Sequence, residues 1–424
     1  MKRILLAAVF VMVAGTAFSQ QAKIQNLRPY DKGGINMFET PKTDTVPFDD
    51  VKVKIGAGFT QQFQALKHSN TSTSTSQLYK LRSGFNLATA NLNIDAQLAK
   101  GIRLNLISYL SARHHQETWV KGGFVQIDAS PFNSEILDNI FKYVTVKIGH
   151  YEDNYGDAHF RRTDNGHALY NPFVGNYILD AFTTEIGAEI DFQKNGFLAV
   201  AAIHNGEIQG NINETPTRNP SFIGKLGYDK QVNTDLRLRL TGSIYHNNGA
   251  ASNTLYTGDR GGSRYYLVME PALTGGAATT AKDAAWSGNL RPGFSRQVTA
   301  IMINPFIKYQ GLELFGTYET AKGKAITEAT KRDVTQMVVE GVYRMGKNEN
   351  LFVGLRYNTV KAELAGMAQE VKVNRVQAGA GWFVTKNMVV KAEYVNQKYN
   401  GYPTANLLSG GNFKGMIFEA AVGF

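Results

Sequence analysis

The feature that most constrains this chain is an alternation of apolar and polar residues with a period of two. In residues 88–98, every second residue is apolar, and Asn91, Asn93 and Asp95 stand between them. Successive side chains of a β-strand point to opposite faces, so this period predicts strands with one apolar and one polar face. The pattern recurs at residues 51–64, 102–106, 144–148, 186–192, 236–240, 312–318, 337–343, 351–357, 376–382, 390–394 and 415–424. We therefore expect an all-β fold.

The first residues predict export. Residues 1–19 have the layout of a signal peptide: Lys2 and Arg3 precede an apolar stretch at residues 4–15, and small residues flank Phe18 before a cleavage point. The alternative is a single membrane anchor, for which the stretch is short. The chain contains no cysteine, which excludes a lipid-anchored cysteine, disulfides and thiolate metal sites. Periplasm, outer membrane and secretion remain.

Beyond the signal peptide, no apolar run approaches the length of a membrane-spanning helix, and the longest good one covers residues 197–203. A membrane protein without such helices must be a closed barrel, in which every backbone polar group is paired. The last strand fits this, because Met416, Phe418, Val422 and Phe424 share its apolar face. We predict a transmembrane antiparallel β-barrel. A soluble β-sandwich or propeller would leave the regular spacing of the turns unexplained.

Connections between the predicted strands alternate between short and long, which is the layout of outer-membrane barrels with short periplasmic turns and long outer loops. Residues 263–270 could form an additional strand. Parity decides against this, because a barrel with both chain ends in the periplasm needs an even number of strands. We predict 16 strands, with 18 as the alternative, and an interior wide enough for water. Residues 133–142 have helical spacing.

Residues 20–50 precede the first strand and contain Pro29, Pro41 and Pro47. They are expected to form a periplasmic strap or partial plug, and disorder is an equal alternative. Residues 51–424 are assigned to the barrel.

The most unusual stretch is the third outer loop, residues 151–182. Residues 146–149 (VKIG), 156–166 (GDAHFRRTDNG) and 171–176 (NPFVGN) resemble motifs of Bacteroidetes-type porins. The chain is more distantly similar to the phosphate-selective porin superfamily, whose members are sixteen-stranded barrels with a third loop folded into the pore. The arginine ladder of the phosphate-selective members is not recognisable here.

The resemblance implies passive diffusion of small hydrophilic solutes or ions across the bacterial outer membrane. It implies membrane lipid as a partner and an outer-membrane assembly machinery that reads the closing strand, with Phe418 and Phe424 as the assembly signal. It also implies that three copies can assemble into a homotrimer. Sequence reasoning keeps one alternative, a non-conducting barrel that serves binding, adhesion or a secretion assembly.

Charges in the third loop predict a pore constriction. Arg161 and Arg162 opposite acidic residues would set a transverse field across a narrow opening and filter small solutes. The predicted constriction residues are Asp153, Asp157, Arg161, Arg162 and Asp164. The alternative is that these charges pair with each other and hold the loop against the wall. Asp153, Asn154 and Asp157 also resemble a loose calcium-binding turn.

Arginines on the polar face of the strands are expected to face the lumen, because arginine in the lipid-facing midplane costs about 2–4 kcal/mol. These are Arg103, Arg237, Arg239, Arg356 and Arg375, and they stand against Asp95, Glu185, Glu189, Asp191 and Glu313. With the two loop arginines they predict a weak anion preference.

Other function classes fit less well. The 45 lysines and arginines exceed the 35 acidic residues, but they are dispersed rather than clustered, which disfavours nucleic-acid binding. No lipase, zinc-protease or nucleotide-binding motif accompanies the loop histidines. These are His114, His115, His150, His159 and His167. We predict no enzyme activity, no cofactor and no metal.

Overall fold

The computed structural model describes most of the chain. The described residues are 22–42, 47–86, 88–111, 118–132, 134–210, 212, 214–258, 261–272 and 286–424. The predicted signal peptide, residues 1–19, lies outside them, and so do His114 and His115. Among the described residues, no helix has both the length and the hydropathy that a membrane crossing requires.

One antiparallel sheet closes on itself, because β1 pairs with β3 on one side and with β17 on the other. Sixteen long strands and the two-residue β2 make up this sheet in the described part of the chain. The strands are β1 (Lys52–Ser69), β2 (Gly84–Phe85), β3 (Thr89–Ala99), β4 (Ile102–Ser111), β5 (Trp119–Ile127), β6 (Val144–Glu152), β7 (Thr184–Lys194), β8 (Phe197–His204), β9 (Ser221–Gln231), β10 (Leu236–Asn247), β11 (Gln297–Tyr309), β12 (Leu312–Lys324), β13 (Arg332–Met345), β14 (Leu351–Ala362), β15 (Val371–Thr385), β16 (Met388–Asn400) and β17 (Asn412–Gly423).

The predicted barrel of 16 strands is therefore confirmed, and residues 263–270 belong to the loop between β10 and β11, as parity requires. The helices are short: η1 (Lys32–Gly34), α2 (Glu135–Phe141) and η2 (Ala158–Arg161). The helix expected within residues 133–142 is α2, whose N-cap Ser134 accepts a hydrogen bond from the Leu137 backbone N–H.

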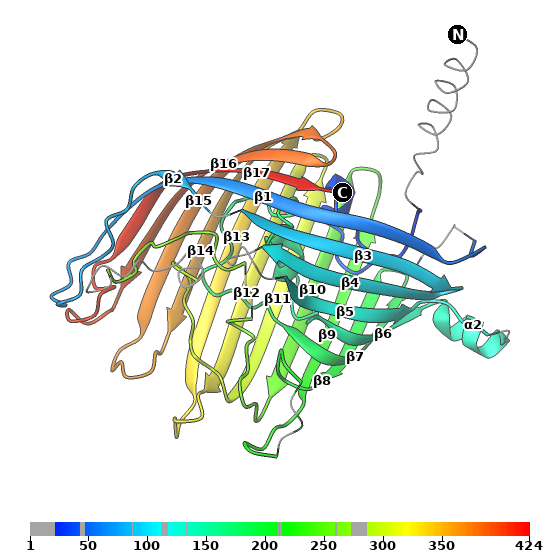
Figure 1. Cartoon of the computed structure of the whole chain (residues 1–424), viewed down its shortest axis with the longest axis horizontal. Coiled ribbons are helices and arrows are strands. Elements are labelled where there is room, and N and C mark those ends of the chain that lie inside the picture. Colours follow the sequence, from blue (N-terminus) through cyan, green and yellow to red (C-terminus); the bar gives the residue numbers. More distant parts are fainter. Residues whose placement is uncertain are drawn as a thin grey trace, which may run out of the picture.

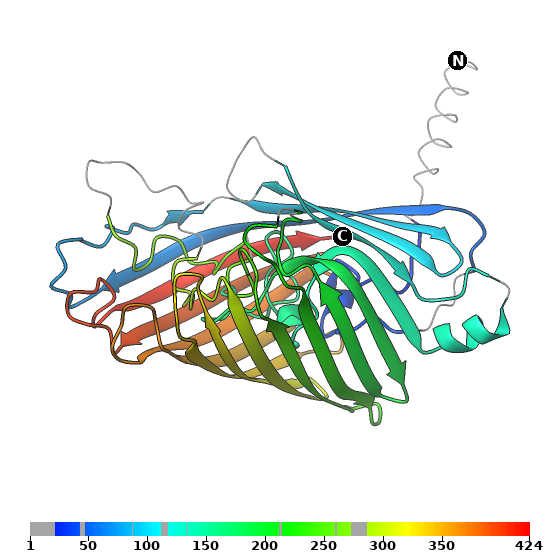
Figure 2. The same cartoon turned by 90° about the horizontal axis from the view of Figure 1, so that it is seen from below.

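Short turns and long loops occupy opposite ends of the barrel. In Figure 1 the loops that follow β1 and β16 project together on the left, while α2 and the end of β17 lie on the right. Figure 2 shows the strands inclined across the wall between these two ends. The turn from β7 to β8 consists of Asn195 and Gly196, both with positive φ (53° and 90°). This geometry matches the twist of the flanking strands and favours an Asn-Gly pair.

The sheet is apolar outside and polar inside. Leu355 is 64% exposed on the outer face, whereas its neighbour Arg356 is 1% exposed on the inner face. Tyr309, Tyr343 and Trp382, each about half exposed, stand where strands meet the short turns, as in the aromatic belt of a membrane interface. Such a surface fits lipid, because soluble monomers rarely expose an apolar band of this extent.

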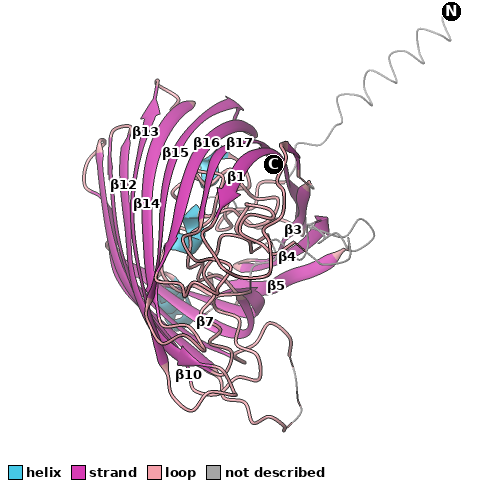
Figure 3. Ribbon diagram, turned by 90° about the vertical axis from the view of Figure 1, so that its left-hand side faces the viewer, coloured by secondary structure: helices cyan, strands magenta, loops and turns pink. Residues whose placement is uncertain are grey.

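Loops occupy the lumen. Figure 3 looks along the barrel and shows loop segments gathered inside the ring of strands. We call residues 153–183, between β6 and β7, the inner loop. Residues 22–42, the N-terminal segment, also reach the inside of the wall, since Tyr30 donates a hydrogen bond to Asp95 of β3 (3.1 Å). The division of the chain into signal peptide, strap and barrel remains a prediction.

Candidate functional site

The inner loop is held in the lumen through its backbone as well as its side chains. Phe173, Val174 and Ile178 are fully buried in two apolar clusters that also contain side chains of the wall, among them Val342 and Val360. The Glu393 carboxylate on β16 accepts hydrogen bonds from the backbone N–H groups of Val174 (2.8 Å) and Gly175 (3.1 Å). Buried backbone groups need partners, and polar side chains of the wall supply them here.

Arg161 lies between two carboxylates of the wall. Its guanidinium is 2.6 Å from Glu340 of β13 and 3.3 Å from Glu313 of β12. Each carboxylate has a second arginine, Arg356 at 2.8 Å from Glu340 and Arg344 at 2.7 Å from Glu313. All five groups are buried. Charge-assisted hydrogen bonds of this kind fix geometry, so Arg161 attaches the loop to β12 and β13.

Asp157 also attaches the inner loop to the wall, here through a negative charge of the loop and positive charges of the wall. Arg239 of β10 donates two hydrogen bonds to its carboxylate, both 2.8 Å, and Lys225 of β9 lies 3.2 Å away. Burial opposes the ionisation of Asp157, but Arg239 and Lys225 outweigh it and hold its pKa below the usual value. The inner loop is thus tied to the wall by charges of both signs.

Arg162 and Asp164, two further predicted constriction residues, are also paired. Arg162 donates to Asp180 within the loop (2.9 and 2.6 Å). Asp164 accepts a hydrogen bond from the Tyr109 hydroxyl (2.5 Å) and forms an ion pair with Lys121. The arginines and aspartates of the loop therefore do not face each other across an opening. Arg162 and Asp180 are in direct contact within the loop. Most of these charged loop residues pair with strands of the wall.

Asp153 differs from the other loop aspartates. Burial raises its pKa, and nearby acidic groups, Glu185 first, raise it further. Asn154 and Asp157 instead contact the Lys225 ammonium at 2.5 and 3.2 Å. The structure therefore does not bring Asp153, Asn154 and Asp157 together as a calcium turn.

The five strand arginines point into the lumen side of the wall and contact different partners. Arg103 pairs with Asp128, Arg237 and Arg239 pair with Asp229, Arg356 pairs with Glu340, and Arg375 donates to Gln397 and to backbone carbonyls of Asn176 and Gly288. Four of them are buried, and Arg237 is the exception, with a side chain 24% exposed. These arginines mainly stabilise the wall and the segments that pack against it, through ion pairs and hydrogen bonds.

Sequence reasoning missed the residues of the N-terminal segment. Asn36 accepts a hydrogen bond from Arg161, and Glu39 lies 3.1 Å from Lys225 and 2.8 Å from Arg239. Burial opposes the ionisation of Glu39, but Lys225 and Arg239 lower its pKa to about 2. An irregular segment has no periodicity from which a lumenal position could be predicted. Its acidic and amide residues are the only signal that the sequence offers.

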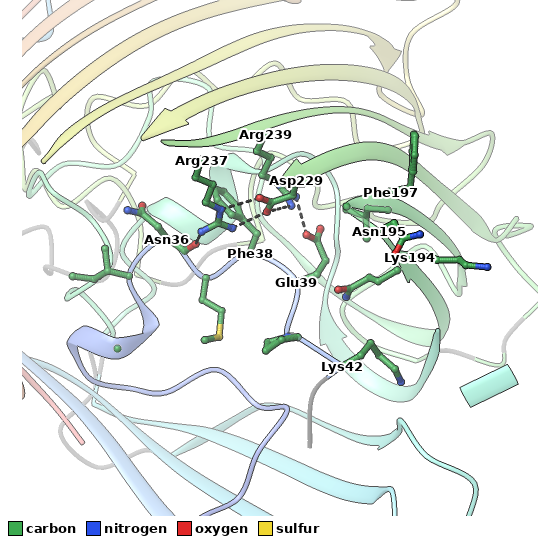
Figure 4. A pocket seen from close by; sticks show the side chains of 17 residues that line it. Asn36, Phe38, Glu39, Lys42, Lys194, Asn195, Phe197, Asp229, Arg237 and Arg239 are labelled. Carbon is green, nitrogen blue, oxygen red and sulfur yellow. Dashed lines mark hydrogen bonds and ion pairs between the residues drawn. The ribbon is translucent and has the colours of Figure 1, made fainter. Parts of the chain in front are cut away.

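Two open cavities, of about 510 and 580 Å³, lie at the short-turn end and share Arg237 and Asn36. We call them together the vestibule. Figure 4 shows Arg237, Arg239 and Asp229 gathered near Glu39 in the first of them. Seven basic and four acidic side chains line the vestibule: Lys32, Lys42, Lys194, Arg237, Arg239, Lys308 and Arg344, against Glu39, Asp229, Asp235 and Glu349. A third cavity of about 200 Å³ lies deeper, between the N-terminal segment and the inner loop.

The described loop histidines have structural partners. His167 stacks on Tyr30, with 4.9 Å between ring centroids, and its Nε2 lies 2.8 Å from the Asn93 amide. Burial lowers the pKa of His167 to about 4, so its ring is neutral at pH 7. His159 forms a hydrogen bond with Glu152.

No family model matches this chain, and no curated protein matches it. Solved structures do. An anion-selective porin from Comamonas acidovorans superposes with a TM-score of 0.54 at 13% identity, over 88% of this chain and 100% of that chain. A trimer form of OmpT, an outer membrane protein of Vibrio cholerae, gives 0.51 at 12% identity, over 89% and 100%. OmpF of Salmonella typhi, in complex with daunomycin, gives 0.52 at 10% identity, over 89% and 98%.

These likenesses establish the fold, which is that of bacterial outer-membrane barrels. They agree with the predicted location in the bacterial outer membrane. They do not separate Bacteroidetes-type or phosphate-selective porins from other porins, so these two resemblances remain predictions.

Proposed function

We propose that this chain is an outer-membrane porin for passive diffusion of small hydrophilic solutes or ions. One observation carries the proposal: a closed barrel with an apolar outer face has a lumen wall of polar and charged side chains. Such a wall replaces the hydration of a permeating solute, which lipid cannot do. The porin neighbours support the same function. Membrane lipid and the outer-membrane assembly machinery are the partners that this function requires, and a homotrimer is the proposed assembly.

The proposed passage is narrow, because the inner loop and the N-terminal segment occupy the lumen. Asp157 and Glu39 share Lys225 and Arg239, so the two segments meet at one wall. We propose the inner loop as the constriction, with Arg161 and Arg162 among its determinants. Only small solutes would pass such an opening.

The vestibule supports a weak anion preference. Its basic side chains outnumber its acidic ones, but its three arginines are paired with carboxylates, as are most of the deeper arginines. The surplus of positive charge lies in Lys32, Lys42 and Lys194. A surplus of positive charge at a mouth raises the local anion concentration, whereas paired charges add little.

Planar-bilayer recording tests the proposal. Folded protein should give discrete conductance steps, and a potassium chloride gradient should give a reversal potential of modest anion preference. Folded protein that inserts but gives no steps would contradict the porin function. A cation-selective reversal potential would contradict only the anion preference.

A second candidate is a non-conducting barrel for binding, adhesion or a secretion assembly. The observation in its favour is that buried contacts link the N-terminal segment, the inner loop and the wall at Asn36, Arg161 and Glu313. The variant Glu39→Gln, which loosens the N-terminal segment, separates the two functions. Steps in this variant but not in the wild type would favour a plugged barrel.

A further inference from the structure

Three ligand-type side chains converge behind the inner loop at the long-loop end of the barrel. Asp153 is the first residue after β6, Glu185 is near the start of β7, and His204 ends β8. Because β6, β7 and β8 are antiparallel neighbours, these positions meet at one end of the wall. The candidate ligand atoms of all three residues lie within 4.8 Å of one another.

The cluster is buried and incompletely hydrogen-bonded. Asp153 is 4%, Glu185 0% and His204 2% exposed. Both carboxylate oxygens of Asp153 and the Nδ1 atom of His204 have no hydrogen-bond partner. Neither carboxylate forms an ion pair with a lysine or arginine among the described residues. Two buried acidic groups without a cation are costly, and a buried polar atom without a partner needs an explanation.

We propose that Asp153, Glu185 and His204 bind one first-row divalent metal ion, with Zn²⁺ as the best fit. An imidazole with two carboxylates suits zinc or manganese better than calcium, which prefers oxygen ligands alone. Bonds of about 2.1 Å at a tetrahedral angle place two ligand atoms roughly 3.4 Å apart. His204 Nδ1 lies 3.3 Å from Asp153 Oδ1 and 3.9 Å from Glu185 Oε2. The Asp153 and Glu185 ligand atoms lie within 4.8 Å of each other, so modest side-chain shifts bring all three ligand atoms to this spacing.

The surroundings orient these ligands as metal sites require. His204 Nε2 lies 2.9 Å from the Tyr151 hydroxyl, which leaves Nδ1 free to face the carboxylates when Nε2 carries the proton. Glu185 accepts hydrogen bonds from Tyr245 (2.6 Å), from the Gly206 backbone N–H (3.1 Å) and from Ser221. Oε2 accepts two of these hydrogen bonds, from Gly206 and Ser221, whereas Oε1 accepts only the one from Tyr245 and keeps a lone pair for a cation. Hydrogen bonds to the far side of His204 and Glu185 are thus of the kind that form the outer shell of a bound metal.

The metal would join the start of the inner loop to β7 and β8, a structural role that does not depend on conduction. The cavity of about 200 Å³ is lined by Tyr151, Glu152 and Asn154, the neighbours of Asp153 in the chain. With three protein ligands, the site keeps a position for water.

Zinc binding by the purified, folded full-length barrel tests the proposal. Protein freed of metal with a chelator is dialysed against zinc chloride and then analysed for metal content and by titration calorimetry. We expect one zinc ion per chain, at least tenfold weaker binding in Asp153→Asn and His204→Ala, and about 10–100-fold weaker binding in Tyr151→Phe, which keeps the ligands. His246→Ala on β10 is the matched control and should bind as the wild type does.

Heat-modifiable migration in electrophoresis establishes that each variant is folded, and Asp153→Asn keeps the shape of the side chain if His204→Ala fails this check. Wild-type protein that binds no zinc, and is stabilised by Asp153→Asn, would show that a proton rather than a metal occupies the cluster. Equal zinc binding by wild type, Asp153→Asn and Glu185→Gln would place the metal elsewhere. Either result overturns the proposal.

Discussion

Arg161 of the inner loop and Glu340 of β13 form a buried ion pair, 2.6 Å long, between residues 179 positions apart in the chain. Glu340 keeps a second arginine, Arg356, so the wall charge is compensated even without the loop. The pair therefore attaches the loop to a wall that is already balanced. Removal of Arg161 should therefore weaken the attachment of the loop without leaving Glu340 unpaired.

Replacing Arg161 and Arg162 with alanine should raise single-channel conductance and shift the reversal potential toward cations. Removing one partner of a buried pair costs about 3–5 kcal/mol. Glu340 and Glu313 keep a second arginine, whereas Asp180 loses Arg162, so the loss of that pair should dominate the destabilisation. Single-channel recording and thermal unfolding measure the two effects. Arg82→Ala, at an exposed loop position, is the control. Unchanged conductance and selectivity would place the inner loop outside the path of the ions.

Replacing Phe424 with alanine should reduce assembly of the barrel more than it reduces synthesis or export. The backbone of Phe424 forms a reciprocal pair of hydrogen bonds with Ala57 (2.9 and 3.0 Å), and its ring is 49% exposed at the end of the closing strand. The amount of heat-modifiable folded protein in the membrane fraction gives the readout. Phe59→Ala removes a ring of similar exposure (46%) from β1 and should have a smaller effect. Equal losses in both variants would mean that apolar area, and not position, matters.

The N-terminal segment should stay docked until the pH is strongly acidic. The pKa of Glu39 is lower in the folded state than in the unfolded state. The stabilisation from Glu39 is therefore complete above the unfolded pKa of 4.5 and is lost as pH falls toward about 2. The chain has no cysteine, so Met37→Cys gives a single site for an environment-sensitive fluorophore. The signal should be constant from about pH 7 to 5 and change below 4.5, with a smaller change when Glu39→Gln is added. A transition centred above pH 4.5 would contradict this assignment.

The anion preference should fade as salt concentration rises. The Debye length falls from about 10 Å at 0.1 M to about 3 Å at 1 M, which screens the open vestibule more than buried pairs. Reversal potentials at the same concentration ratio but different absolute concentrations measure this. A preference that persists at about 1 M salt would instead locate selectivity at a desolvated constriction.

The fold could be predicted from the sequence because alternation reports directly on which side chains share a face. It placed Arg239, Arg356 and Arg375 on the polar face, and the structure has all three buried on the inner side of the wall. Alternation does not report the height of a side chain in the barrel, nor the path of a loop. The partners of Arg161 and Asp157 could therefore not be predicted, since they depend on where the inner loop meets the wall.

The proposed metal ligands also could not be predicted together from the sequence. Glu185 and His204 belong to neighbouring strands, and strand pairing alone brings their backbones to one end of the wall. Asp153 joins them only because the chain turns inward directly after β6. The sequence-based suggestion of Asp153, Asn154 and Asp157 grouped residues that are close along the chain, whereas the fold separates their contacts.

The contacts of Lys225 imply an order of events during biogenesis. This single ammonium group touches Glu39 of the N-terminal segment and Asp157 of the inner loop, and both lie inside a ring that β1 and β17 close. Threading either segment into a finished ring would expose both carboxylates and the ammonium to an environment without their partners. We therefore expect the sheet to curl around its contents, with the seam between the first and last strands as the last part of the wall to form.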